Sequence, residues 1–127
     1  MAFEQADLSK FRVRGLKTLF DSDGDNTAQA IKAGAGQLIM LEVSNINAAD
    51  AFVQLFDLAT GDVTVGTTTP RLSFLVPAGD GSVYGHMEKI FIAVPISFEV
   101  AITYACTLTP TGSGGPTTGL TFNALYI

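Results

Sequence analysis

Short segments in which apolar and polar residues alternate dominate this chain, and Gly, Pro, Asp or Asn ends each of them. Alternation with a period of two is typical of β-strands that bury one face. RLSFLV (71–76) has Leu72, Phe74 and Val76 on one face, and LTFNALYI (120–127) is predicted to close the chain as a strand. LIMLEVSN (38–45) is apolar on both faces at first, which predicts a central strand, and AFVQLFDL (51–58) is another strong strand. Helical periodicity is not sustained over any useful length. The pattern predicts an all-β fold, an antiparallel, jelly-roll-like β-sandwich of about eight strands.

The less regular segments give further expectations. Residues 11–20 are predicted to form a strand with a β-bulge at Gly15, where the alternation slips by one position. The acidic segment 21–26 (DSDGDN) is expected to end that strand, and VTV (63–65) to form a short one. Residues 82–108 are rich in β-branched and aromatic residues, with a break or edge at Pro95. Two segments complete the set: residues 28–33, ambiguous between strand and helix, and residues 109–119, a predicted loop.

The length of 127 residues fits a single domain. We expect residues 1–10 to form an N-terminal arm or short irregular segment, and residues 11–127 to form one β-sandwich domain. A signal peptide and a bilayer-spanning run of about 20 apolar residues are both absent from the sequence, so no membrane partner is expected. Hydrophobic residues make up 47% of the chain and charged residues only 15%. Such a thinly charged surface indicates contacts with partners.

The charge is negative overall but locally basic near the N-terminus. A net charge of −5 argues against nucleic-acid binding, which requires a basic face to displace phosphate counterions. Four of the seven basic residues are nevertheless close together, namely Lys10, Arg12, Arg14 and Lys17. This basic segment is either a docking surface for an acidic partner or an ordinary solvated strand edge, and the sequence leaves both open.

One acidic cluster has the spacing of a metal loop. Asp21, Asp23 and Asp25 match the first half of a calcium-binding loop. The sixth position, which requires Gly, is Asn26, and the twelfth, which requires Glu, is Lys32. A solvated turn is therefore favoured over a cation site, and no metal or other cofactor is expected.

Residues suited to catalysis are few. His86 is the sole histidine and is expected at the surface or in an interface. Cys106 is the sole cysteine, which excludes an internal disulfide, and its apolar neighbours predict a buried, inert thiol. No nucleophile motif surrounds Cys106, Ser73 or Ser82. The sequence therefore predicts a protein that is not an enzyme.

The aromatic residues are expected to pack the core. Nine phenylalanines are a large number for a sandwich of this size, and core packing is their ordinary role. Trp is absent, which weakens a carbohydrate-binding reading. Tyr84, Tyr104 and Tyr126 remain as substitutes for a sugar-stacking platform.

Residues 36–81 resemble a group of small virion proteins of tailed bacteriophages and prophages. A strand ends in Asn45 and is followed by Asn47 and small residues, and the next strand ends in the Phe56–Asp57 pair. A V-G-T-x-x-P step (65–70) and a V-P-A-G turn (76–79) follow, and the A-I-T strand and final ALYI echo the tail of the group. Residues 82–100 depart from the group's pattern, and residues 1–35 have no counterpart in it.

The resemblance implies a β-sandwich module of a virion without catalytic residues. The first reading is a capsid decoration or cement protein that binds the major capsid protein on the capsid exterior, bridges neighbouring subunits, and is assembled in the host cytoplasm. The alternative is a fibre-head or receptor- or carbohydrate-binding module. Self-association as a dimer or trimer is expected in either case, and the terminal strand 120–127 is a candidate for exchange between copies.

Overall fold

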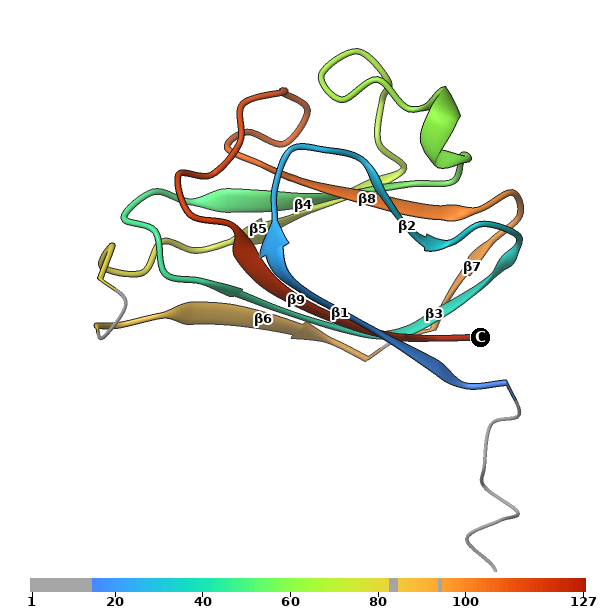
Figure 1. The fold of residues 1–127 in the computed structure, drawn as a ribbon, viewed down its shortest axis with the longest axis horizontal. Helices are drawn as coiled ribbons and strands as arrows, with labels where there is room; N and C mark the ends of the chain where they lie inside the picture. The colour runs from blue at the N-terminus through green and yellow to red at the C-terminus, as the bar shows by residue number, and fades with distance from the viewer. Residues whose placement is uncertain (1–14, 83–84, 94) are drawn as a thin grey trace, which may run out of the picture.

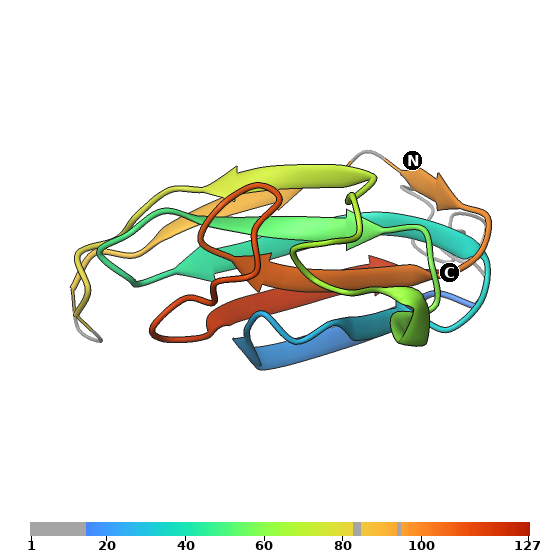
Figure 2. The same ribbon diagram turned by 90° about the horizontal axis from the view of Figure 1, so that it is seen from above.

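The computed structural model describes residues 15–82, 85–93 and 95–127, and these residues form two antiparallel β-sheets packed face to face (Figures 1 and 2). Sheet A contains β1 (Lys17–Gly24), β9 (Leu120–Tyr126), β3 (Gly36–Asn45), β6 (Glu88–Ile92) and β7 (Ile96–Phe98). Sheet B contains β2 (Gln29–Lys32), β8 (Ile102–Thr107), β4 (Ala51–Phe56) and β5 (Leu72–Val76). A short 3-10 helix, η2 (Thr60–Asp62), lies between β4 and β5. The predicted all-β sandwich is confirmed, with nine strands in the described residues against about eight predicted.

The strand pairs are nested along the chain. β4 pairs with β5, β3 with β6 and β7, β2 with β8, and β1 with β9, so each pair encloses the one before it. The chain is therefore one long two-stranded ribbon that turns back at the β4–β5 connection. Folding this ribbon on itself adds the β3–β9 and β4–β8 pairings, which complete the two sheets. This arrangement is the jelly roll that the sequence predicted.

The core lies between the sheets and follows the alternation of the strands. Leu41 and Val43 of β3 face Val53 and Leu55 of β4 across the sandwich, and all four are fully buried. The Tyr104 ring of β8 stacks on a ring from β9, with centroids 4.0 Å apart and planes 9° from parallel. Burial of this apolar area is the main favourable term for the fold.

The structure bears on several expectations about single elements. Residues 28–33, ambiguous from sequence, contain the strand β2. Pro95 lies between β6 and β7, at the break predicted there. Residues 109–119 form a loop between β8 and β9, and the chain then closes as a strand. β9 pairs with β1 and β3 of its own chain, so exchange between copies is not needed to complete sheet A.

Three expectations need correction or fall outside the described residues. β1 does not end at Asp21 but runs to Gly24, with an irregular register between these two residues. Gly24 continues the strand because it pairs with Leu120 of β9, and its packing there is close: a Cβ would lie 3.0 Å from Cys106 Sγ and 3.1 Å from the Leu120 carbonyl oxygen. Gly15 lies in a turn before β1 with φ 74°, and the predicted strand residues 11–14 lie outside the described residues.

The third correction concerns VTV (63–65), which forms no strand: Val63 and Thr64 belong to no regular element, and Val65 begins a turn. The Thr68 amide donates to the Thr64 carbonyl (2.8 Å), and the Thr64 amide donates to the Thr68 hydroxyl (2.9 Å). These local bonds take the place of ladder bonds to a neighbouring strand.

In the part of the chain that the structure describes, no helix has the length and apolar character needed to cross a membrane.

Candidate interaction surface

Of the basic segment singled out in the sequence, only Lys17 is described. It begins β1, is exposed, and lies opposite Tyr126 of β9. Lys10, Arg12 and Arg14 lie outside the described residues. The docking reading of this segment therefore stays a prediction.

Two carboxylates of the acidic cluster, those of Asp21 and Asp25, accept hydrogen bonds from the backbone or from a core tyrosine. Asp21 accepts a hydrogen bond from the Tyr104 hydroxyl (2.6 Å) and from the Asp23 amide (2.9 Å). Asp25 accepts from the Thr27 amide (2.9 Å). Among the described residues, no three His, Cys, Asp or Glu side chains come together in a group suited to a metal. The half-match to a calcium loop thus corresponds to a strand end and a turn.

His86 and Cys106 have the environments that the sequence indicated. The His86 side chain is 63% exposed and bonds to Glu88, and this hydrogen bond raises the pKa of His86. Cys106 is fully buried in the core, and burial raises the pKa of its thiol to about 12, with smaller contributions from Asp21 and Asp25. A thiol held protonated in this way is a poor nucleophile. Tyr104 is also buried, so it is not a sugar platform.

The residues that carried the resemblance hold turns in place. Asn45 is fully buried, and its amide donates to the Ala49 carbonyl (3.0 Å) and the Val76 carbonyl (3.2 Å). Its oxygen accepts from the backbone amide of Asn47 (2.9 Å), so one side chain joins the β3–β4 turn to the end of β5. In the V-P-A-G turn, the Gly79 amide donates to the Asn47 carbonyl (2.7 Å). A Cβ on Gly79 would lie 2.5 Å from the His86 carbonyl oxygen, so the turn requires glycine.

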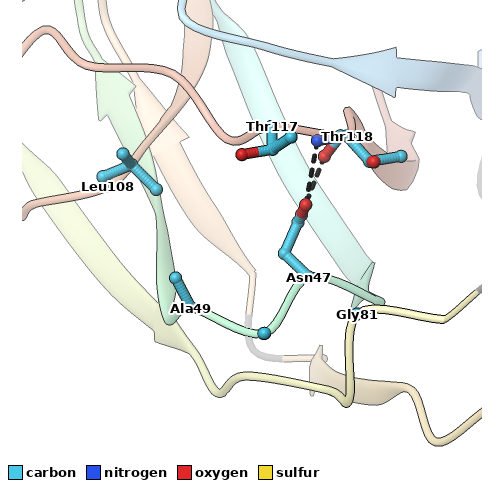
Figure 3. A pocket seen from close by; sticks show the side chains of 7 residues that line it. Asn47, Ala49, Gly81, Leu108, Thr117 and Thr118 are labelled. Carbon is cyan, nitrogen blue, oxygen red and sulfur yellow. Dashed lines mark hydrogen bonds between the residues drawn. The ribbon is translucent and has the colours of Figure 1, made fainter.

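A hollow at this end of the sandwich is lined by Asn47, Ala48, Ala49, Gly81, Leu108, Thr117 and Thr118. Figure 3 shows Asn47 facing Thr118, whose amide donates to the Asn47 side-chain oxygen (2.8 Å). The Asn47 amide donates to the Thr118 carbonyl (2.8 Å) and to Asn45 Oδ1 (2.9 Å). The polar groups of Asn47 are therefore used to hold the β8–β9 loop, which makes this hollow a product of loop packing.

Two loops cover the outer face of sheet B. The β4–β5 loop (57–71) and the β8–β9 loop (108–119) arch over this sheet in Figure 1 and lie above it in Figure 2. The Thr103 hydroxyl donates to the Leu58 carbonyl (2.7 Å), and Gln54 Nε2 donates to the Gly112 carbonyl (3.0 Å). As a result, all six residues of β8 are buried, although every second one points away from the core.

The outer face of sheet A has no such cover from any described segment (Figure 1). The strand register shows which residues point outward, because Phe122 and Ala124 of β9 are buried in the core. We define the sheet A outer face by the residues of alternate parity: Thr18, Phe20, Ser22, Met40, Glu42, Ser44, Lys89, Phe91, Thr121, Asn123 and Leu125. Phe20 is 66% exposed and Phe91 is 59% exposed. These two exposed rings make the sheet A outer face the candidate interaction surface.

The expectation that the phenylalanines pack the core is wrong for these two residues. Phe91 alternates with the half-buried, core-facing Ile90 and Ile92 of β6, so a strict period-two reading of KIFI places it outward. Phe20 alternates in the same way with Leu19, which packs against the core. The alternation within each strand therefore predicts that both rings point outward. The high phenylalanine content favoured the core-packing expectation instead.

Comparison with protein-family models, with curated proteins and with solved structures gives no match for this chain.

Proposed function

We propose that this chain is a non-enzymatic structural protein of a tailed-bacteriophage virion, a decoration or cement protein on the capsid exterior. In this role it binds the major capsid protein and bridges neighbouring subunits. Many copies that bind only the assembled shell stabilise it by mass action. The jelly roll is compatible with this role, since viral capsid proteins use it, but lectin domains do too.

The observation that carries the proposal is the outer face of sheet A, which no described segment covers and from which Phe20 and Phe91 project. Polar side chains that would serve chemistry are engaged in holding turns, as with Asn45, Asn47 and Asp57. The chain leaves exposed a strand face with two phenylalanines, which favours adhesion through contact area. The basic segment Lys10, Arg12, Arg14 and Lys17 is the second element of the proposal, as the part that docks on an acidic capsid surface.

The first test is the copy number of the chain in purified virions, measured by quantitative mass spectrometry. A decoration protein is expected on the order of hundreds of copies per particle, because it follows the shell symmetry. A few tens of copies at the tail would support the fibre-head alternative. Absence from the particles would contradict both.

The second test measures binding of the purified chain to particles that lack it. We expect the double variant Arg12→Glu, Arg14→Glu to bind about tenfold more weakly or worse, because charge reversal repels an acidic partner. Lys32→Glu, a reversal on β2 of sheet B, is the matched control and should bind as the wild type does. Unchanged binding of the double variant would remove the basic segment from the docking surface.

A further inference from the structure

The outer face of sheet A carries a projection and a hollow side by side. The hollow lies over β1, β9 and β3 and is lined by Thr18, Phe20, Met40, Glu42, Asn123 and Leu125. Phe91 projects from β6, on the other side of β3, and is not part of the lining. Phe20, Asn123, Glu42 and Phe91 form one row across the sheet by strand register. Adjacent strands are about 4.8 Å apart, so Phe91 and Phe20 are roughly 14 Å apart, with the hollow between them.

We propose that this face joins two copies of the chain about a two-fold axis, with Phe91 of each copy seated in the hollow of the other. In a two-fold interface both copies use the same patch. If residue i of one copy contacts site j of the other, then residue i of the second copy contacts site j of the first. A face that holds both a projecting ring and a recess is suited to that arrangement. Aromatic side chains seated in apolar recesses are also the typical anchors of interfaces.

The charge distribution favours a second copy as the occupant. The face carries two charged residues, Glu42 and Lys89, whose charged atoms are 3.9 Å apart, so it is neutral. The described residues outside it carry nine acidic and three basic side chains. Two copies would therefore repel each other elsewhere, and this face is where they approach without a net like charge. Asp23 lies at its margin, at the irregularity where β1 ends.

The same geometry places Glu42 near the proposed axis. Glu42 lies on β3, between the hollow and Phe91, so the two copies bring their Glu42 side chains toward each other. The neighbouring Lys89 of each copy offsets this repulsion. The ion pair is therefore predicted to control whether two copies associate.

This inference extends the proposed function: the outer face of sheet A serves adhesion between copies, and attachment to the shell is left to the basic segment. One chain supplies one basic segment (Lys10, Arg12, Arg14 and Lys17), whereas a pair supplies two, and bridging of neighbouring capsid subunits requires two points of attachment. Self-association is tested with the free protein and shell binding with particles, so either proposal can fail while the other stands.

Sedimentation velocity of the purified full chain tests the self-association. The proposed contact spans the four strands β1, β9, β3 and β6, and we expect dimers to form as the concentration rises between about 1 µM and about 1 mM. Phe91→Ser should weaken dimerisation about tenfold or more. Leu75→Ser is the control, because Leu75 is 46% exposed on β5 of sheet B and should leave dimerisation unchanged.

Charge reversal distinguishes binding of a second copy of the chain from binding of a different partner at this face. Lys89→Glu alone leaves two carboxylates on each face and should weaken dimerisation about tenfold. Adding Glu42→Lys restores neutrality in both copies at once and should restore dimerisation, whereas a different partner would still meet reversed charges. A wild-type chain that stays monomeric up to about 1 mM, or a double variant that does not recover, would overturn the proposal.

Discussion

At the residue scale, Asp57 shows how one side chain holds a turn that lies far away in the sequence. It follows β4 directly, and its Oδ1 accepts from the amides of Val100 (2.8 Å) and Ala101 (3.3 Å), while Oδ2 accepts from the Glu99 amide (3.1 Å). Arg71 Nη1 lies 3.8 Å from Oδ2. The amides of Glu99 and Val100 lower the pKa of Asp57 most, partial desolvation opposes them, and Ala101 and Arg71 add to the lowering.

Asp57→Asn is predicted to destabilise the fold at neutral pH. The side-chain NH2 group of Asn cannot accept a hydrogen bond, so bonds to the 99–101 turn are lost. Because the carboxylate is 22% exposed, we expect a loss of about 1 kcal/mol in the free energy of unfolding, the low end of the range for such bonds. Urea unfolding at pH 7 measures it, with the exposed Asp62→Asn as the control.

The same variant gives a pH dependence with a defined sign. A carboxyl whose pKa is lower in the folded chain stabilises the fold above its ordinary pKa of 3.8, and that stabilisation is lost as the pH falls through the lower folded value. The difference between wild type and Asp57→Asn should therefore be full at pH 7 and shrink toward zero in acid. A difference that grows below the ordinary pKa would contradict this account of Asp57.

Residue roles of this kind were the least predictable from the sequence. The buried thiol of Cys106 was predicted, since its immediate neighbours are apolar. The roles of Asn47 and Asp57 were not, because their partners, Thr118 and the 99–101 turn, are brought near only by the folded chain. Composition suggested that the phenylalanines pack the core, but Phe91 is placed by strand parity and lies outside.

At the element scale, the two faces of sheet A have opposite roles. Phe122 of β9 points inward, is fully buried and stacks on Tyr104. Phe91 of β6 points outward and is 59% exposed. The same residue type therefore contributes to stability on one face and, by our proposal, to association on the other.

A matched pair of substitutions tests this division. Phe122→Ala removes a buried ring and is expected to lower the free energy of unfolding by about 3–5 kcal/mol. Phe91→Ala removes an exposed ring and is expected to change it by about 0.5 kcal/mol or less in dilute, monomeric protein. Chemical unfolding followed by circular dichroism measures both. Equal losses would show that Phe91 is part of the core.

Strands were predictable from the sequence where the segment was long enough to distinguish a strand from a turn. The ten-residue β3 alternates regularly from Leu41 onward, after a register shift between Leu38 and Met40, and its predicted span of 38–45 lies within the observed Gly36–Asn45. VTV was too short for a period to distinguish a strand from a turn, and local threonine bonds decided the outcome. The extension of β1 to Gly24 depends on close packing against Leu120 and Cys106, which the local sequence does not contain.

At the scale of the whole molecule, the nested ribbon determines what must come together for the chain to fold. The sequence predicted two packed sheets, because alternating strands must bury one face. It did not predict which strand pairs with which, since β1 and β9 lie at opposite ends of the described chain and pair only in the folded state. The innermost pair, β4 with β5, closes the shortest loop of the nested pairs and the outermost pair the longest.

This topology predicts slow, cooperative folding. Most contacts join residues far apart in sequence, and the entropy of closing those loops is lost before the contacts form, so refolding should occur in about milliseconds to seconds. Stopped-flow circular dichroism is suitable because the chain contains no Trp.

Phe122→Ala is the informative variant, since β9 pairs with both β1 and β3 and joins the two ends of the ribbon. If the outermost pairing forms after the rate-limiting step, this variant should mainly accelerate unfolding and leave the refolding rate nearly unchanged. Refolding that finishes within microseconds would show that local contacts, and not the nested pairing, control the fold.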